Sequence, residues 1–518
     1  MKRWLSLSIV LCALAPWSVL RAGNAEHVVL IVWDGLRPDS VTPENTPTLH
    51  ALAQKGTFFN RHHPVYPSST EVNGTALATG MYPQHSGIVG NREYRPLIAA
   101  NENSALEKID AIRKGDIAMK GAYLAVPTIY ETLQAQGLPT MVAGTKPIAI
   151  FADRSEKRVT EAAQKSVVIF EGQSLPPDIL SKLEAALGTF PKTPTYPDVG
   201  QNTWTTRVLI DELWKESVPK LSLLWLSDPD YSQHHSQPGS KEALAALKAN
   251  DELLALLLAK LDAKGIRNKT DILLVSDHGF STTDALVDFS TLLSEAGFRA
   301  YRKFLNKPEK GDILVVGNGG SVFFYVIDHD RETIPRLVNF LQRSKYSGVI
   351  FSREALPGTF PLKTAFLNSP EAPDIVLSLR WTDAANASGV RGMISMDASA
   401  ISTRKPGQGM HGSLSPYDMH NTLIAAGPDF RKGLRNDLPS GNADVAPTIL
   451  HILGVKPAQK MDGRVLEEAL TNTTKVLKAE EKKLETENKE TGWQQYLKTS
   501  SIGTTTYFDE GNGNQTSH

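Results

Sequence analysis

The sequence predicts an α/β fold in which a largely parallel central sheet lies between layers of helices. Three runs are continuously apolar and then end in acidic or histidine residues, at positions 27–35, 221–230 and 270–279. Runs of this kind, bounded by turn residues, are typical of strands that are buried on both faces. Helical patterns lie between them, for example at 46–56 and 241–265. Alternation of strand and helix along a chain favours a parallel sheet.

The order of these patterns predicts a core that is interrupted by insertions. After about residue 405 the core pattern returns, and no internal repeat is present. We expect the following division: a core from 23–284 with a small excursion at about 93–126, a cap insertion from 285–405 with its own strands and helix, a second core part from 406–470, and a charged helix (475–490) and tail within 471–518.

The composition limits the class of protein and its partners. The chain has 518 residues, of which 41% are hydrophobic and 21% charged, and its formal net charge is −1. These values are typical of a globular protein. They give no electrostatic reason to expect bulk nucleic acid or acidic membranes as partners.

The first 22 residues read as a signal peptide, with a short basic start, an apolar run and small residues before a cleavage point. An uncleaved membrane anchor is the alternative, which the shortness of the run and Pro16 disfavour. Cys12, the single cysteine, lies inside this segment. We therefore expect an exported protein, periplasmic or secreted, without a disulfide bond and without a transmembrane anchor after cleavage. The oligomeric state is not predicted.

Metal-ligating side chains gather where the predicted strands end and in one later loop. Because ligands bind beyond the carboxyl ends of strands in such sheets, these residues are candidates for one shared site. Each motif alone is weak, since a DG pair after a strand is usually a turn. Mixed nitrogen and oxygen ligands suit Zn²⁺, whereas an all-oxygen set would indicate Mg²⁺ or Ca²⁺. The candidates are Asp34, Asp230, His234, Asp277, His278 and His411.

The stretch YPSSTEVNG, residues 66–74, places three hydroxyls in a row at Ser68, Ser69 and Thr70. A helix is expected to start after Pro67 and to stop at Gly80. Capping the helix is the ordinary role of a hydroxyl at such a position. The alternative is a nucleophile, because helix N-terminal N–H groups stabilise an alkoxide and an incoming phosphate.

Together these motifs resemble the alkaline phosphatase superfamily and, within it, the type I phosphodiesterase/nucleotide pyrophosphatase family. The resemblance extends from about residue 27 to 467. It rests on VWDGLRPD around Asp34, on YPSSTEVNG with Thr70 at the threonine and Asn91 at the asparagine 21 residues later, and on DPDYSQHHSQPG, SDHGF and GMHGS. It implies an alkaline-phosphatase-like fold with an inserted cap region.

The resemblance also implies a site with two Zn²⁺ ions, other divalent metals being possible, and a small phosphate ester as substrate. One zinc would be held by Asp34, Thr70, Asp277 and His278, and the other by Asp230, His234 and His411. Thr70 would attack phosphorus, and water would then hydrolyse the phospho-threonine. Asn91 and the backbone N–H of Glu71 would hold a non-bridging oxygen. Ser68 and Ser69 are left with turn and capping roles.

Two departures from the family concern the substrate. Glu71 stands where nucleotide-cleaving relatives carry an aromatic residue that stacks on the base, so nucleotide specificity is in doubt. Trp225 stands where they often carry a tyrosine, and we expect it to supply half of an aromatic clamp. A sulfatase is less expected, because residues 66–74 lack the C/S-x-P-x-R signature. A non-catalytic binding protein is disfavoured by the intact ligand set.

Lys146 indicates an alternative function, that of a phosphomonoesterase or phosphonate hydrolase. Superfamily phosphomonoesterases and phosphonoacetate hydrolases have a lysine in a similar stretch, where it contacts the phosphate. If Lys146 does the same, the substrate is a monoester or a phosphonate, because the lysine offers charge to a dianion. The opposing interpretation, which we favour from the sequence, is a surface lysine after a strand.

Overall fold

The computed structural model describes residues 23–398, 404–473 and 476–515. The predicted signal peptide, residues 1–22, lies outside them. The largest sheet has nine strands. In spatial order they are β22 (Leu434–Asn436), β2 (Thr57–Phe59), β21 (Leu423–Ala426), β10 (Thr270–Val275), β1 (His27–Trp33), β9 (Leu221–Leu226), β6 (Thr140–Gly144), β7 (Val167–Phe170) and β8 (Gln173–Leu175).

The centre of this sheet is parallel, as the sequence predicts. β1 pairs in parallel with β10 on one side and with β9 on the other. β6 and β7 continue the parallel order beyond β9, whereas β21 and β8 run antiparallel to their neighbours. The carboxyl ends of β1, β9, β10 and β6 therefore meet at one edge of the sheet.

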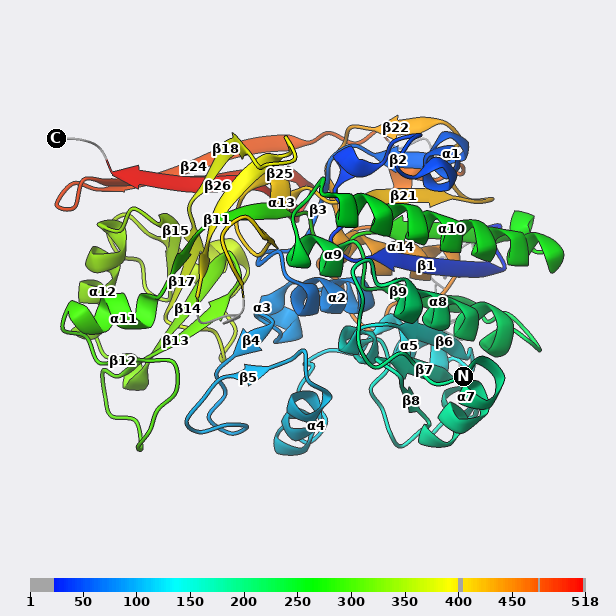
Figure 1. The fold of residues 1–518 in the computed structure, drawn as a ribbon, viewed down its shortest axis with the longest axis horizontal. Helices are drawn as coiled ribbons and strands as arrows, with labels where there is room; N and C mark the ends of the chain where they lie inside the picture. The colour runs from blue at the N-terminus through cyan, green and yellow to red at the C-terminus, as the bar shows by residue number, and fades with distance from the viewer. Residues whose placement is uncertain (1–22, 399–403, 474–475, 516–518) are drawn as a thin grey trace, which may run out of the picture.

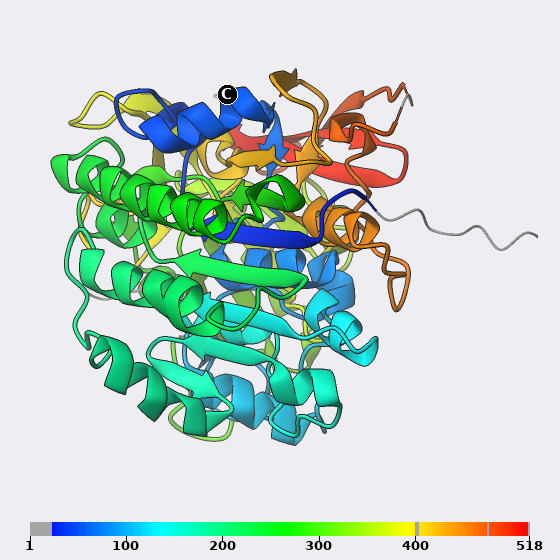
Figure 2. The same ribbon diagram turned by 90° about the vertical axis from the view of Figure 1, so that its right-hand side faces the viewer.

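Helices cover both faces of the sheet (Figure 2). Alternate residues of β1 point to opposite faces, as in any strand: Val29 and Ile31 pack in one core cluster, Val28 and Leu30 in the other. The first cluster includes residues of α1 (Pro47–Lys55), α7 (Leu180–Leu187), α8 (Val199–Arg207) and α10 (Lys241–Ala263). The second includes residues of α2 (Thr70–Thr79), α5 (Ile129–Ala135) and α14 (Val445–Ile452). Over the described ranges, no helix has the length and apolarity that crossing a membrane requires.

A second sheet forms a separate lobe on the left of Figure 1. Its strands are β12 (Ala300–Tyr301), β13 (Ile313–Asn318), β14 (Ser321–Val326), β17 (Ile375–Leu379), β15 (Ser347–Ser352) and β16 (Phe360–Pro361), with α11 (Phe289–Glu295) and α12 (Thr333–Gln342) beside it. These strands all come from the predicted insertion, although its boundaries remain predictions.

Short elements join the two lobes near the site. A four-stranded sheet consists of β18 (Trp381–Ala385), β19 (Arg391–Asp397), β11 (Ser281–Val287) and β20 (Gly409–Met410). The small excursion predicted at 93–126 contains β5 (Ser104–Ala105), which pairs with β4 (Arg92–Glu93), and α4 (Ile109–Ala118).

The prediction of a charged helix over 475–490 is wrong. The described part of this segment forms β24 (Glu480–Asn488), which pairs along its length with β25 (Trp493–Ile502), and β26 (Thr505–Gln515) completes an antiparallel sheet. β24 is an edge strand, and its first residues are exposed. Charged residues protect an exposed strand edge from pairing with other chains, so the charges have a role that needs no helix. This C-terminal sheet runs along the top of Figure 1, beside both lobes.

Trp493 anchors the C-terminal sheet to the second lobe. Its side chain is buried in the hydrophobic cluster of that lobe. We expect Trp493→Ala to lower the free energy of unfolding by about 3–5 kcal/mol, because it removes a buried aromatic and leaves a cavity. Urea denaturation followed by near-UV circular dichroism measures the change. Leu484→Ala is the control, since Leu484 lies exposed on β24 and its loss should cost about 0.5 kcal/mol or less. Equal losses in the two variants would contradict the anchoring role.

Candidate active site

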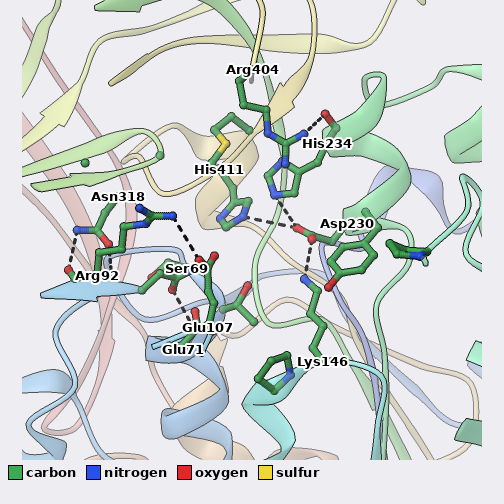
Figure 3. A pocket seen from close by; sticks show the side chains of 18 of the residues that line it. Ser69, Glu71, Arg92, Glu107, Lys146, Asp230, His234, Asn318, Arg404 and His411 are labelled. Atoms are coloured by element: carbon green, nitrogen blue, oxygen red, sulfur yellow. Dashed lines mark hydrogen bonds and ion pairs between the residues drawn. The ribbon is translucent and has the colours of Figure 1, made fainter. Parts of the chain in front are cut away.

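The predicted ligands meet at the carboxyl edge of the central sheet. Asp34 follows β1, Asp277 and His278 follow β10, and α9 (Asp230–His235) begins shortly after β9. His411 follows β20, which pairs with β11 directly after the β10 loop. The parallel register of β1, β9 and β10 brings these positions together although they lie far apart in sequence. Figure 3 shows His234, His411 and Lys146 directed at Asp230.

Each of the three histidines is oriented by a backbone carbonyl. The Nδ1 atoms of His234, His278 and His411 lie 3.0, 2.9 and 2.8 Å from the carbonyl oxygens of Gly409, Gly279 and Ser68. A carbonyl only accepts, so each Nδ1 carries the hydrogen and each Nε2 presents a lone pair. All three Nε2 atoms face the carboxylates. Histidine ligands of metal ions are typically held in this way.

Each of the three carboxylates has one oxygen that lies near these Nε2 atoms and has no hydrogen-bond partner among the described residues. Asp34 Oδ1, Asp230 Oδ1 and Asp277 Oδ2 are buried and accept no hydrogen bond among the described residues. His278 Nε2 lies 3.6 Å from Asp34 Oδ1 and 3.2 Å from Asp277 Oδ2. Asp230 Oδ1 lies 3.2 Å from His234 Nε2 and 3.5 Å from His411 Nε2. Facing lone pairs at these distances repel unless cations lie between them.

The donor set therefore fits two metal ions. Asp230, His234 and His411 place their donor atoms within 4.8 Å of one another, and so do Asp34, Asp230 and His278. The resemblance assigns Asp277 rather than Asp230 to the second group. Asp277 Oδ2 lies 3.2 Å from His278 Nε2 and is therefore nearer to it than Asp230 Oδ1, which is 4.0 Å away. Asp230 thus reaches toward both groups, and mixed imidazole and carboxylate ligands suit Zn²⁺.

The pKa values of the carboxylates and imidazoles are shifted because these groups are buried close together. Burial, followed by repulsion from Asp277, raises the pKa of Asp34 well above its usual value. Burial also raises the pKa of Asp230, but His234 and Lys146 more than offset this, so the pKa ends well below normal. Burial lowers the pKa of His234 to about 4, and burial with the neighbouring imidazoles lowers the pKa of His411 well below its usual value. A bound divalent cation would oppose the rise in the pKa of Asp34, because it favours the charged carboxylate.

Thr70 stands at the start of α2 with its hydroxyl toward this centre. Its Oγ1 lies 3.3 Å from His278 Nε2. The expected roles of the neighbouring serines are only partly right. Ser68 donates to the carbonyl oxygen of Ser413, in the loop after His411. Ser69 occupies the N-cap position, but its hydroxyl makes no capping hydrogen bond and is buried without a partner among the described residues.

Asn91 and Glu71, which the resemblance assigns to a non-bridging oxygen, lie in direct contact. The backbone N–H of Glu71 donates to Asn91 Oδ1 over 3.1 Å. Both residues line the same cavity as Thr70. Burial, followed by repulsion from Glu107, raises the pKa of the Glu71 carboxyl well above its usual value. The side chain at this position is therefore an acid whose charged form is disfavoured.

Lys146 is not a surface residue, contrary to the interpretation that the sequence favours. It follows β6 and is buried, with Nζ 2.9 Å from Asp34 Oδ2 and 2.6 Å from Asp230 Oδ2. It thus contacts one carboxylate from each implied metal group, and it also lines the cavity. Its ammonium lies over the ring of Tyr231, 4.8 Å from the centroid.

Trp225 does not line the cavity, so its prediction as an aromatic clamp is wrong. The indole is buried in the core between the sheet and α2. A Cβ on Gly74 of α2 would lie 3.1 Å from the Trp225 ring, which shows how closely the helix covers it. The indole N–H donates to Asp34 Oδ2 over 2.9 Å. Trp225 is therefore a positioning residue for a metal ligand.

The cavity of about 270 Å³ in front of this centre includes residues that the motifs did not indicate. Arg92 lies 3.6 Å from Glu107, and Arg404 donates to the carbonyl oxygen of His234. Arg92 and Tyr231 could have been predicted from the sequence, because they directly follow Asn91 and Asp230. Arg404 and Asn318 come from the insertion, where no motif pointed to them. The additional lining residues with charged, aromatic or amide side chains are Arg92, Glu107, Glu171, Tyr196, Tyr231, Asn318 and Arg404.

Solved structures share this fold. Murine ectonucleotide pyrophosphatase/phosphodiesterase 5, as an inactive variant in complex with AMP, matches with a TM-score of 0.60 and 17% identity over 86% of this chain and 100% of that chain. The human protein matches with a TM-score of 0.57 and 17% identity over the same shares of the two chains. At these identities the similarity establishes the α/β architecture.

Sequence relatives fall in the same group. Mouse bis(5'-adenosyl)-triphosphatase enpp4 is 22% identical over 444 residues, which are 84% of this chain and 79% of that protein. Human ectonucleotide pyrophosphatase/phosphodiesterase family member 1 is 26% identical over 255 residues, 48% of this chain but 22% of its own length. A venom phosphodiesterase of Crotalus durissus collilineatus is 26% identical over 259 residues, 50% of this chain and 25% of its own. The chain thus covers about a quarter of these two longer relatives.

Fold and site together place the protein among the hydrolases of the alkaline phosphatase superfamily. The model of the type I phosphodiesterase/nucleotide pyrophosphatase family matches residues 28–413, well over half of the chain. The chain belongs to this family, as the sequence motifs indicate.

Trp225→Phe tests the positioning role of the indole. An aromatic ring is kept, while the N–H donor to Asp34 and part of the packing volume of the indole are lost. We expect metal affinity to fall about 10- to 100-fold and kcat/KM to recover at saturating metal. Metal titration with an activity readout measures this. Trp214→Phe is the matched control, because it removes the indole donor to Ser222 in the other core cluster. An altered KM at saturating metal, with metal affinity unchanged, would instead restore the substrate-clamp interpretation.

Proposed function

We propose that the protein is a dizinc phosphodiesterase or nucleotide pyrophosphatase that hydrolyses phosphate diester or phosphoanhydride bonds through a phospho-threonine intermediate. The observation that carries the proposal is the position of the Thr70 hydroxyl. It lies at the start of a helix and within 3.3 Å of His278 Nε2, in a cluster of unpartnered carboxylate oxygens. Family membership supports the reaction class.

The protein groups have separable roles in this reaction. Thr70 Oγ1 forms the bond to phosphorus, the bond to the leaving oxygen breaks, and water later cleaves the phospho-threonine. Asn91 and the Glu71 backbone N–H would donate to a non-bridging oxygen where charge develops, and the N–H would then exchange its hydrogen bond to Asn91 Oδ1 for one to the substrate. Asp34, Thr70, Asp277 and His278 would hold one ion, and Asp230, His234 and His411 the other. When bound, the two ions supply activation of the attacking oxygen and stabilisation of the leaving oxygen.

Thr70→Ala tests the nucleophile. We expect its activity on bis-p-nitrophenyl phosphate to fall by at least about 10³-fold, since the covalent route is lost. Rapid quench and peptide mass spectrometry of the wild type with this diester should find a p-nitrophenyl-phosphoryl group on Thr70, because one p-nitrophenolate leaves and the other stays bonded to phosphorus. Thr75→Ala is the matched control, because Thr75 lies on the same helix with a buried, unpartnered hydroxyl among the described residues. Phosphorylation elsewhere, or full activity of Thr70→Ala, would contradict the mechanism.

The position of Lys146 supports a second candidate, a phosphomonoesterase or phosphonate hydrolase on the same fold. A buried ammonium that lines the cavity supplies charge for a dianionic phosphoryl group. Arg92 and Arg404 add positive charge at the cavity wall, and Glu71, Glu107 and Glu171 oppose it. The balance between these groups decides which substrate class is preferred.

Lys146→Met separates the two candidates. A monoester dianion carries one charge more than a diester, so if Lys146 contacts the phosphoryl group the variant should lose about tenfold more activity on p-nitrophenyl phosphate than on bis-p-nitrophenyl phosphate. Because Lys146 also contacts Asp34 and Asp230, both rates will fall, and their ratio is the measurement. An unchanged ratio would limit Lys146 to neutralising the metal ligands, and a wild-type preference for the diester would support the first candidate.

The location of the protein is proposed from its N-terminal segment alone. We infer export to the periplasm or the medium, with cleavage after residue 22 or 25. Mass spectrometry of the mature N-terminus in culture fractions tests this inference. An intact N-terminus in the membrane fraction would contradict it.

A further inference from the structure

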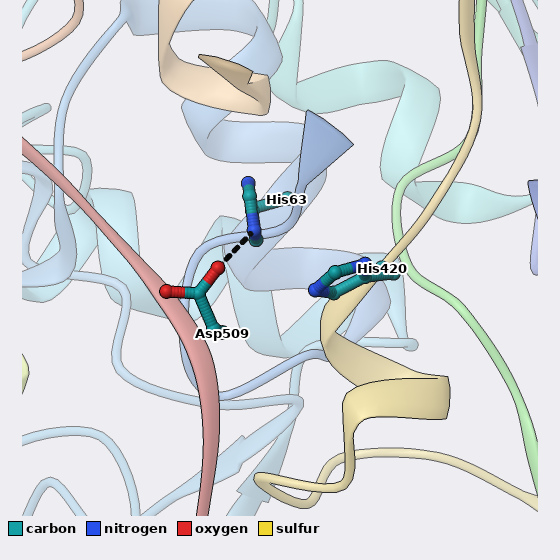
Figure 4. Close-up of side chains that lie close together, drawn as sticks. All are labelled: His63, His420 and Asp509. Carbon is teal, nitrogen blue, oxygen red and sulfur yellow. Dashed lines mark hydrogen bonds and ion pairs between the residues drawn. The ribbon is translucent and has the colours of Figure 1, made fainter. Parts of the chain in front are cut away.

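A second cluster of metal-ligating side chains lies outside the candidate active site (Figure 4). His63 belongs to the short strand β3 (His62–His63), His420 follows α13 (Pro416–Met419), and Asp509 belongs to β26. One donor atom from each residue lies within 4.8 Å of the other two. The three residues therefore join two parts of the core to the C-terminal sheet.

The hydrogen bonds of His63 leave a lone pair directed at a carboxylate. Its Nδ1 lies 2.9 Å from the carbonyl oxygen of Ser440, so Nδ1 carries the hydrogen. Its Nε2 lies 3.1 Å from Asp509 Oδ1. Two acceptors at this distance repel unless a proton or a metal cation lies between them.

The second imidazole distinguishes these two possibilities. The ring centroids of His63 and His420 are 4.7 Å apart, edge to face, and no described residue forms a hydrogen bond with the His420 ring. A proton shared between His63 and Asp509 needs no second imidazole, whereas a metal ion does.

The spacing matches that of metal ligands. Ligand bonds of about 2.1 Å in a tetrahedral zinc site separate the ligand atoms by about 3.4 Å. The 3.1 Å between His63 and Asp509 is close to this value, and close to the 3.2 Å between Asp230 and His234 in the active site. Two of the three ligands are also held by hydrogen bonds with groups outside the cluster. Ser440 orients His63, and Ser500 Oγ lies 3.0 Å from Asp509 Oδ2.

One nearby charge opposes a cation. Arg61 lies 3.3 Å from Asp509 Oδ1, but it also pairs with Glu481 over 2.8 Å. Glu481 belongs to β24 and is largely exposed, so its charge offsets that of Arg61 at the surface. His63, which contacts the same oxygen of Asp509, is fully buried.

We propose that His63, His420 and Asp509 bind a structural Zn²⁺-type divalent cation whose fourth position is open to water. Two imidazoles and one carboxylate suit Zn²⁺ rather than Mg²⁺ or Ca²⁺. The ion clamps β26 to β3 and to the end of α13. Because α13 follows the loop that carries His411, the clamp also tethers that loop to the C-terminal sheet.

Zinc stoichiometry measured by native mass spectrometry tests the proposal. The chain is equilibrated with Zn²⁺ alone, and we expect His420→Asn to hold one ion fewer than the wild type. His329→Asn is the matched control, because it removes an imidazole from another His–Asp pair, with Asp374, 2.6 Å apart. The increase in melting temperature on adding Zn²⁺ should be smaller in His420→Asn than in His329→Asn.

Measuring the catalytic activity of the same variant separates this proposal from the proposed function. The His420 ring has no hydrogen-bond partner among the described residues, so His420→Asn should fold and should retain its kcat on bis-p-nitrophenyl phosphate at saturating metal. Asp509→Asn provides a second variant with the same expected loss of one ion. Equal zinc content in His420→Asn, His329→Asn and wild type would overturn the proposal and leave His63 and Asp509 as a proton-held ion pair. The active-site ions contribute the same zinc content to every variant, so they do not affect the difference between His420→Asn and its control.

Discussion

Repulsion between buried groups of like charge governs the arrangement of this protein. Asp34, Asp230 and Asp277 are almost completely buried, and each has an oxygen within 4.0 Å of His278 Nε2. Removing a carboxylate from water costs several kcal/mol even after relaxation. Lys146 offsets part of this cost at Asp34 and Asp230, and the remaining lone pairs are oriented to receive cations. In the proposed dizinc site, stability and chemistry would depend on the same ions.

The residues of this cluster are held in place because the strands that precede them are packed tightly in the core. β1, β9 and β10 are packed on both faces, so the residues that follow them have little freedom. Trp225 joins the core to the cluster directly, since one indole packs against α2 and donates to Asp34. Gly74 makes this possible, because a Cβ there would collide with Ile148 and press on Trp225. The core and the ligand shell are therefore one structure.

The sequence was most informative where local pattern and position coincide. Strand-terminal acids and histidines could be predicted as ligands because parallel strands bring their ends together whatever their order. Strand order itself is not visible in a sequence. For this reason Lys146 seemed exposed, although β6 lies beside β9 with Gly144 opposite Trp225. Trp225 was misjudged because a side chain before a strand end can point into either layer. The charges of β24 were misread because lysine and glutamate fit an exposed strand edge as well as a helix surface.

The position of β1 at the centre of the sheet has a consequence for how the chain folds. Asp34 meets Trp225 across 191 residues, and Gly35 meets Asp277 across 242. Closing such long loops slows folding, because conformational entropy is lost before the contacts form. Until residue 275 has been synthesised, His27–Trp33 has no complete pair of neighbours. This strand is apolar and uncharged after its first residue, so a newborn chain is prone to aggregate there. The long-range pairing of β1 therefore lengthens the time for which this apolar strand stays exposed during folding.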